Sequence, residues 1–335
     1  MTTTPLAAVT ARRPPTAPDT DAAIDVRALT KSYGTTQALD GIDLTVPRGS
    51  VLGVLGPNGA GKTTLIRILS TLLPPDSGTA LVDGHDVVAT PQAVRAAVGL
   101  TGQYASVDES LSGRQNLYVV ARLHGFTRSA ARRRTDDLLA RFSLTEAATR
   151  LTRTYSGGMR RRLDLATSLV AAPRVLYLDE PTTGLDPRAR NEVWAEVRRL
   201  VEQEGTTVLL TTQYMEEADA LADAITVIDH GRVIAHGTAD ALKSRLGGRI
   251  LHVRPTDPAA DLDAIAQVLA TASGGRTPDL DHGSGTATLP LDDDRALTTA
   301  IAALGASGIP LAAVETPLPS LDEVFLTITD QEPRP

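Results

Sequence analysis

The sequence contains no cysteine, few aromatic residues and no long apolar run, and each absence excludes a class of site or function. Without cysteine there is no disulfide, no thiol catalysis and no cysteine-ligated metal, which fits a reducing compartment. The six histidines are scattered without a ligand spacing, so we predict no structural zinc. Aromatic residues make up only 3% of the chain, so we expect a core of Leu, Val, Ile and Ala.

An excess of positive charge is also missing. The formal net charge of −7 argues against a nucleic-acid partner, because non-specific affinity for nucleic acid depends on a basic face. Arginine clusters at 132–134 and 160–162 are local exceptions, and a solvated helix face is the favoured interpretation of both. No window holds 18 consecutive apolar residues, and the arginines at 12 and 13 are followed by prolines rather than by the apolar core of an export signal. We therefore expect a soluble, cytosolic protein.

The 335 residues suffice for one principal domain and a smaller accessory one. Residues 1–23, rich in Thr, Ala and Pro, predict a disordered tail. Over 24–247, short apolar runs alternate with helical patterns, which is typical of an α/β domain with buried parallel strands, and a helical insert is expected at about 104–171. A pair of glycines then precedes 248–335, where a β-α-β-α-β alternation, interrupted by a loop at 273–286, predicts a small accessory α/β domain.

The principal domain is organised around a glycine-rich loop between an apolar run and a helical pattern. Its residues match the spacing GxxxxGK[ST], and they are Gly56, Pro57, Asn58, Gly59, Ala60, Gly61, Lys62, Thr63 and Thr64. Glycines let successive backbone amides point at one anion, and the helix beginning near Gly61 adds its positive end. Lys62 reaches the terminal phosphates of a nucleotide, and Thr63 is placed to ligate Mg²⁺. The motif predicts a phosphate-binding loop without specifying the nucleotide.

Two carboxylates, Asp179 and Glu180, follow an apolar strand pattern at 175–178. They fall at the edge where ligands bind in open α/β sheets. Phosphoryl transfer needs one carboxylate near the metal and another that orients the attacking water. We assign Asp179 to Mg²⁺ and Glu180 to the water; a strand that merely ends in acidic residues is the alternative.

Ser156, Gly157 and Gly158 open another helical pattern downstream of the loop. We expect Ser156 to cap this helix, while the two glycines expose backbone amides at its positive end. The arrangement predicts a second anion site within one chain. A Ser-Gly-Gly cap on its own more often serves only to begin a helix.

Together these elements resemble the ATP-binding subunit of ABC transporters over about residues 24–245. The matching elements are the loop at 56–64, Gln103 after a strand, Ser156-Gly157-Gly158, Asp179-Glu180 and Gly184-Leu185-Asp186. The resemblance implies an α/β fold, namely a P-loop nucleotide-binding domain of ABC type with a mixed sheet core and a helical subdomain. It also implies ATP and Mg²⁺, and a head-to-tail dimer with a second copy of the chain. In that dimer, Ser156 to Gly158 of one subunit touch the γ-phosphate held on Lys62 of the other.

Three further residues take their roles from the resemblance. Tyr33 lies where the family places an aromatic ring against adenine, and a core tyrosine is the alternative. Gln103 matches the residue that contacts Mg²⁺ or water and links to the membrane partner. Asp186 matches the loop that communicates across the dimer.

The sequence departs from the family pattern at two positions. Met159 replaces the glutamine that usually follows the two glycines, which leaves the backbone amides in place. Gln213 stands where the family usually has histidine. An amide can hydrogen-bond the γ-phosphate but cannot carry a positive charge or shuttle a proton. If Glu180 is the main catalytic group, hydrolysis survives this change; if a histidine were essential, the chain would hydrolyse ATP slowly. The candidate catalytic residues are Glu180, Gln213 and Gln103.

Within the family, the likeness is greatest to drug-export ATPases of the daunorubicin-resistance type. It rests on the stretch at 155–166, on Gln213 and on the stretch at 319–326. It implies the ATP-hydrolysing subunit of an exporter of a small, hydrophobic, drug-like compound, attached to a separate membrane permease at the inner face of the membrane. A DNA- or ribosome-associated ABC ATPase is the alternative, which lacks support because the chain has neither a long coiled-coil insert nor a second phosphate loop. For residues 249–330, a docking or regulatory role and a simple packing role both remain open.

Overall fold

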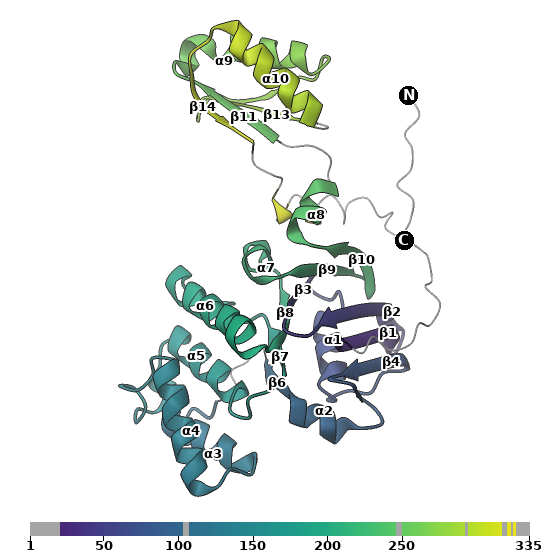
Figure 1. The fold of residues 1–335 in the computed structure, drawn as a ribbon, viewed down its shortest axis with the longest axis vertical. Coiled ribbons are helices and arrows are strands. Elements are labelled where there is room, and N and C mark those ends of the chain that lie inside the picture. Colours follow the sequence, from purple (N-terminus) through teal and green to yellow (C-terminus); the bar gives the residue numbers. More distant parts are fainter. Residues whose placement is uncertain are drawn as a thin grey trace.

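The computed structural model describes residues 21–102, 107–245, 250–291, 294–316, 320–322 and 324–325. A six-stranded sheet forms the centre of the larger domain (Figure 1). Its strands lie in the order β10 (Arg232–Gly237), β9 (Ala224–Asp229), β3 (Val51–Leu55), β8 (Thr207–Thr212), β7 (Val175–Asp179) and β6 (Val98–Thr101). Neighbouring strands are parallel except β9 and β10, which form an antiparallel hairpin. The carboxyl ends of β3, β8, β7 and β6 therefore meet at one edge of the sheet.

A second, antiparallel sheet comprises β2 (Thr36–Pro47), β1 (Ala22–Tyr33), β4 (Ser77–Val82) and β5 (His85–Asp86) in that order. Its apolar face shares one buried cluster with the helix α1 (Lys62–Leu69), with β3 and with α2 (Pro91–Ala97). β1 begins at Ala22, and both Ala22 and Ala23 are buried. The predicted tail of 1–23 is therefore too long by two residues, because a pair of alanines carries no strand signal; its first 20 residues lie outside the described part.

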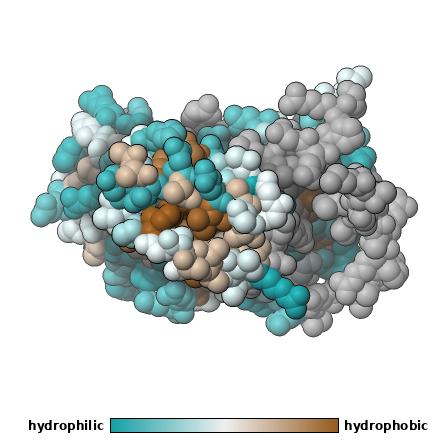
Figure 2. All heavy atoms as spheres, turned by 90° about the horizontal axis from the view of Figure 1, so that it is seen from above, coloured by the Kyte–Doolittle hydropathy of each residue, from teal (hydrophilic) through white to brown (hydrophobic). Residues whose placement is uncertain are grey.

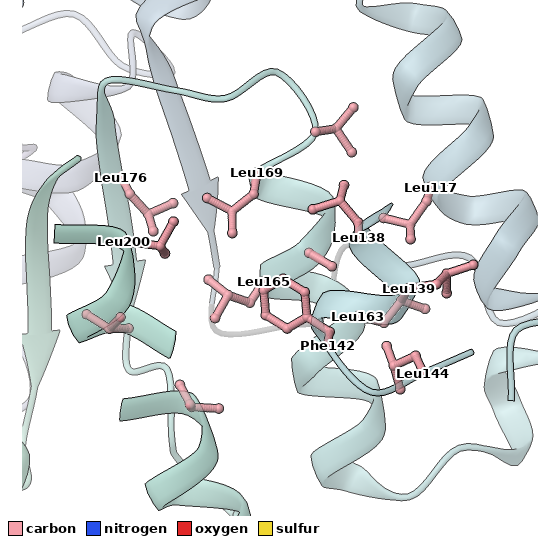
Figure 3. Packing of buried hydrophobic residues seen from close by; sticks show 14 of the residues in the cluster. Leu117, Leu138, Leu139, Phe142, Leu144, Leu163, Leu165, Leu169, Leu176 and Leu200 are labelled. Atoms are coloured by element: carbon pink, nitrogen blue, oxygen red, sulfur yellow. The ribbon is translucent and has the colours of Figure 1, made fainter. Parts of the chain in front are cut away.

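The helical subdomain consists of α3 (Gly113–Leu123), α4 (Arg128–Arg141), a 3₁₀ turn (Thr152–Thr154) and α5 (Gly157–Ser168). These elements fall within the insert expected at about 104–171. Leu117, Leu138, Phe142 and Leu163 point toward one another in its core (Figure 3). This core is aliphatic apart from very few rings, as the composition suggested, and it continues into Leu176 of the central sheet.

Three more helices complete the larger domain: α6 (Pro187–Glu204), α7 (Met215–Leu221) and α8 (Ala239–Arg245). Val193, Val197 and Leu200 form the buried face of α6, at the spacing of an amphipathic helix. Asp186 caps this helix, since its carboxylate accepts a hydrogen bond from the amide of Ala189 at 2.9 Å.

The C-terminal domain has the element order β11 (Ile250–Pro255), α9 (Pro258–Ala272), β12 (Asp279–Asp281), β13 (Thr286–Pro290), α10 (Asp294–Ser307) and β14 (Leu311–Glu315). Its antiparallel strands lie in the order β12-β13-β11-β14, which is the ferredoxin-like arrangement. The β-α-β-α-β prediction missed one strand, because the segment taken for a loop at 273–286 contains β12 and leads into a hairpin. β12 has a single apolar residue, Leu280, so its alternation is too short to detect.

The end of the described chain returns to the larger domain. Leu321 and Val324 are buried in a cluster with Met215, Ala218 and Leu242. The range 248–335 therefore includes a segment that packs on α7 and α8 rather than on the ferredoxin-like sheet.

Figure 2 views the molecule from the top of Figure 1. On this face hydrophilic and apolar residues are interspersed, and the apolar residues form one small group. Two large apolar side chains of the C-terminal domain are exposed, Ile301 and Val314. Over the described ranges, none of the helices combines the length and the hydropathy needed to cross a membrane.

Candidate active site

The glycine-rich loop connects β3 to α1 and depends on glycine at two close approaches. A side chain at Gly56 would place Cβ 2.2 Å from the carbonyl oxygen of Ile228. At Gly61, where φ is +108°, Cβ would lie 2.4 Å from the carbonyl oxygen of Ala38. No side chain caps α1, and its first turn contains no acidic residue. The first amides of α1 are therefore available to an external anion.

Lys62 lies at the start of α1 with its side chain folded over the loop. Its ammonium donates hydrogen bonds to the carbonyl oxygens of Gly56 at 2.7 Å and Pro57 at 3.1 Å. Burial lowers the pKa of the Lys62 ammonium, and the carboxylates of Glu180 and Asp179 partly oppose this shift. The loop thus holds a desolvated cation beside two carboxylates, which is suited to binding phosphate oxygens.

Asp179 is the last residue of β7 and lies close to both β8 and the start of α1. Its Oδ1 accepts a hydrogen bond from the Thr211 hydroxyl of β8 at 2.5 Å, and its Oδ2 lies 3.4 Å from the Thr63 hydroxyl of α1. Carboxylate and hydroxyl oxygens are hard donors, and Mg²⁺ in nucleotide sites takes one or two of them together with phosphate oxygens and water. The residues present therefore fit Mg²⁺. No larger cage of His, Cys, Asp or Glu side chains occurs among the residues that the structure describes.

Glu180 follows with a left-handed backbone, at φ +51°. Its amide donates to the carbonyl oxygen of Thr211 at 2.9 Å, and its Oε2 accepts a hydrogen bond from the Thr183 hydroxyl at 3.2 Å. Non-glycine residues adopt such a backbone only where their surroundings enforce it, and such positions cluster at functional sites. The turn directs the carboxylate to the same edge of the sheet as the loop.

One open hollow of about 620 Å³ is lined by half of the predicted site residues. We call it the phosphate-loop hollow, and its lining is Tyr33, Ala38, Asn58, Gly59, Gly61, Lys62, Thr63, Thr64, Glu180, Thr183 and Gln213. Residues from five separate chain segments thus meet at one place. Tyr33 is 46% exposed there, so the alternative of a core tyrosine is excluded. Gln103 lies outside the described residues.

A second hollow, of about 590 Å³, lies at the start of α5, and we call it the α5 hollow. It is lined by Ser156, Gly158 and Asp186 together with Arg141, Phe142, Ser143, Met159, Arg162, Arg188, Ala189, Glu192, Val193, Ala195 and Glu196. The Ser156 hydroxyl accepts a hydrogen bond from the Met159 amide at 3.2 Å, which confirms the predicted cap. Gly157 faces open space, since a Cβ added there would meet no neighbouring side chain within 4 Å. None of these residues lines the phosphate-loop hollow.

Sequence reasoning missed several side chains around the carboxylates. Thr211 and Thr183 hold Asp179 and Glu180, and the signal for Thr211 was a polar residue directly after the apolar run of β8. The interpretation of the cluster at 160–162 as a solvated face is wrong for Arg161, whose side chain is only 11% exposed. The cluster lies on a helix that packs against the sheet edge, so the middle arginine faces inward.

A family model described as ABC transporter matches residues 39–183. The daunorubicin/doxorubicin resistance ATP-binding protein DrrA of Streptomyces peucetius is 53% identical to this chain over 307 residues, which are 92% of each protein. The Nod factor export ATP-binding protein I of Burkholderia orbicola is 42% identical over 246 residues, which are 73% of this chain and 81% of that protein. The solved structure of cbiO1 from Clostridium perfringens, part of the ABC transporter complex cbiONQ, is similar with a TM-score of 0.61 and 30% identity, over 65% of this chain and 89% of that one.

Proposed function

The chain belongs to the ABC transporter family of ATP-binding proteins, and from that premise we propose that it energises the export of a small, hydrophobic, antibiotic-like compound. It is an ATPase with the ABC nucleotide-binding fold. The observation that carries the proposal is the phosphate-loop hollow, where Lys62, Glu180 and Gln213 face one space beside an exposed Tyr33. A relative that is 53% identical over 92% of its length is named for resistance to daunorubicin and doxorubicin.

Each residue around the hollow has a proposed role in ATP hydrolysis. Tyr33 stacks on the adenine ring, and the loop amides with Lys62 hold the phosphates. Thr63 and Asp179 would hold Mg²⁺, with Gln103 as a further ligand; the bound ion would neutralise charge on the phosphates. Glu180 orients and deprotonates the attacking water, and Gln213 donates a hydrogen bond to the γ-phosphate.

We propose that the α5 hollow completes the site on a second copy of the chain. Ser156, Gly157 and Gly158 present a helix N-terminus away from the phosphate-loop hollow of their own chain, and anions bind at such ends. A head-to-tail dimer brings this end to the γ-phosphate on the partner, with Asp186 beside the contact. Nucleotide binding then closes the dimer and hydrolysis reopens it.

Transport requires a separate membrane subunit in this proposal. The chain would lie at the inner face of the cell membrane through that permease, whose pore would select the compound. The relatives are named for different compounds, so membership of the family does not determine which compound is exported. A DNA- or ribosome-associated function is not favoured, because both relatives are named for resistance or export.

Co-purification from membranes tests this function. The full chain, isolated with a tag from detergent-solubilised membranes of its source cells, should retain a multi-helix membrane protein. Inverted vesicles containing both should accumulate daunorubicin when MgATP is added. Vesicles carrying the Glu180→Gln chain serve as the control and should not accumulate daunorubicin. A chain that recovers no membrane protein, or vesicles with equal uptake for both chains, would contradict the proposal.

A further inference from the structure

Arg161 lies on α5, the helix that begins at the Ser-Gly-Gly motif, and connects it to the turn that carries Asp179 and Glu180. Its Nε donates a hydrogen bond to the carbonyl oxygen of Pro181 at 2.6 Å. One terminal nitrogen donates to the carbonyl oxygens of Glu180 at 3.1 Å and Asp179 at 3.3 Å. The other donates to the carbonyl oxygen of Gly102 at 2.8 Å. A single side chain thus holds three consecutive residues of the carboxylate turn and the residue before Gln103.

The guanidinium is enclosed by the residues that it joins. The Arg161 side chain is 11% exposed. It forms an ion pair at 3.2 Å with Asp164, whose side chain is 1% exposed. Burial lowers the pKa of Arg161, while the carboxylates of Asp164 and Glu217 oppose the shift. An arginine remains charged at neutral pH even so, because its ordinary pKa lies far above 7. The carbonyl oxygens therefore face a permanent, desolvated cation, to which hydrogen bonds are stronger than to a neutral donor.

The turn itself requires such support. Glu180 has a backbone φ of +51°, a conformation that a non-glycine residue keeps only when its surroundings enforce it. The Thr211 carbonyl holds the Glu180 amide on one side of the turn, and Arg161 holds the carbonyl oxygens on the other. Planar guanidinium geometry suits several fixed acceptors at once, which a lysine ammonium cannot match.

We infer that Arg161 is a positioning residue for ATP hydrolysis, fixing the direction of the Glu180 carboxylate. The inference rests on the proposed role of Glu180. Because Arg161 lies on α5, five residues after Ser156, a displacement of α5 by the partner's nucleotide reaches the carboxylate turn directly. Arg161 does not line the phosphate-loop hollow, so its loss should change the rate of the chemical step more than the binding of ATP.

The test compares steady-state ATP hydrolysis by the full chain carrying Arg161→Gln or Arg161→Lys with the parent. We expect kcat to fall by about 100-fold for Arg161→Gln and about tenfold for Arg161→Lys, since small displacements of a catalytic group cost rate on this scale. KM, and the affinity for a fluorescent ATP analogue measured directly, should stay within about twofold. Arg161→Lys keeps the charge, so it decides the question if Arg161→Gln fails to fold. A kcat within about twofold of the parent in either folded variant would overturn the inference.

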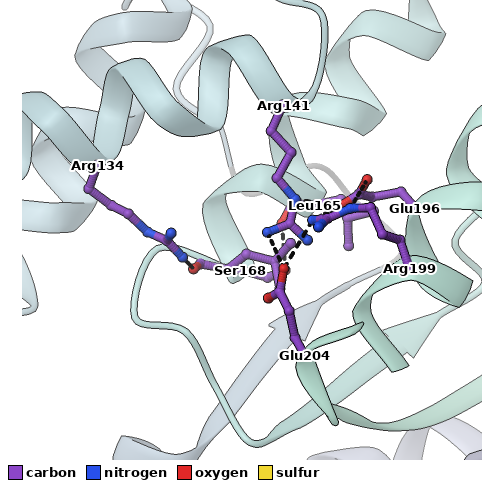
Figure 4. Close-up of polar contacts among 8 residues, drawn as sticks. Arg134, Arg141, Leu165, Ser168, Glu196, Arg199 and Glu204 are labelled. Atoms are coloured by element: carbon purple, nitrogen blue, oxygen red, sulfur yellow. Dashed lines mark hydrogen bonds and ion pairs between the residues drawn. The ribbon is translucent and has the colours of Figure 1, made fainter. Parts of the chain in front are cut away.

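Arg134 provides a matched control. It is also a partly buried arginine, and it donates hydrogen bonds to the carbonyl oxygens of Leu169 and Val170, which follow the last residue of α5. Figure 4 shows the Arg134 side chain extending toward the end of α5 near Ser168. Arg134→Gln should lower the melting temperature and leave kcat unchanged. If Arg134→Gln lowers kcat as much as Arg161→Gln at an equal loss of melting temperature, the role of Arg161 is only structural.

The Glu180→Gln chain in the same assay separates this inference from the proposed function. A dead Glu180→Gln with a fully active Arg161→Lys contradicts only the role of Arg161. A fully active Glu180→Gln contradicts the assignment of the water-activating group itself, and the role of Arg161 with it.

Discussion

The phosphate-loop hollow and the α5 hollow differ in what surrounds a helix N-terminus. At α1 the first amides have no side-chain cap, and a buried lysine, two carboxylates and an exposed tyrosine stand nearby. At α5 the serine caps the helix, and the two glycines leave its tip open to solvent. The first end has everything needed to hold and attack a phosphate, whereas the second has only the means to touch one. The difference is what we expect if, as proposed above, the two ends serve the same nucleotide from different chains.

Removing the cation of the phosphate-loop hollow should have the largest effect. In Lys62→Ala, the phosphates lose their buried positive partner, so turnover should fall by about 100- to 1000-fold together with ATP affinity. Hydrolysis of radiolabelled ATP measures the rate. Lys31→Ala is the control, since Lys31 forms a surface ion pair with Asp76 and should change turnover little. Undiminished hydrolysis by Lys62→Ala would refute the loop assignment.

Adding charge at the start of α5 should affect hydrolysis but not binding. Gly157 has room for a side chain, so Gly157→Asp should fold normally while its carboxylate repels the partner's γ-phosphate. We expect about a 100-fold loss of turnover with unchanged affinity of the single chain for ATP. Gly157→Ala, which adds Cβ without charge, is the comparison variant. Equal rates for Gly157→Asp and Gly157→Ala would contradict an electrostatic role for the start of α5.

Gln213 should contribute less than either helix end. In Gln213→Ala the γ-phosphate loses one neutral hydrogen bond, and turnover should fall by about tenfold. Gln213→His restores a donor and should retain the parent rate at neutral pH, since an imidazole N–H can donate as the amide does. Rates of the three chains measured side by side decide the point. If Ala costs nothing, Gln213 does not sense the phosphate.

The smallest predicted effect concerns stability rather than rate. Glu217 is fully buried, accepts hydrogen bonds from Thr182 and Trp194, and has its pKa raised by burial. Because the folded state then holds a proton that the unfolded state releases, this residue's contribution to stability is complete below its ordinary pKa of 4.5 and is lost as pH rises through the raised value. In Glu217→Gln, the free energy of unfolding measured by urea titration should therefore fall less as pH rises across that window. Glu216→Gln, which removes an exposed carboxylate from the same helix, is the comparison variant.

The sequence predicted most of the fold, and half of the predicted site residues line the phosphate-loop hollow. The ABC fold class, which came from the resemblance, is confirmed by the solved relative. The cap at Ser156 is a local feature, so the residues at the start of the helical pattern were enough to predict it. The inward turn of Arg161 was missed, since a run of three arginines does not show which one faces the sheet. The β12 strand was missed because two aspartates flank its single apolar residue.

The mass of the Glu180→Gln chain in solution tests the two-chain site most directly. With Mg²⁺ and ATP, light scattering after size exclusion should give twice the 35.2 kDa of one chain. ADP should leave the single-chain mass, and adding Gly157→Asp to Glu180→Gln should abolish the ATP-dependent dimer. A Glu180→Gln chain that binds ATP yet keeps the mass of one chain, or a dimer that tolerates Gly157→Asp, would contradict the account.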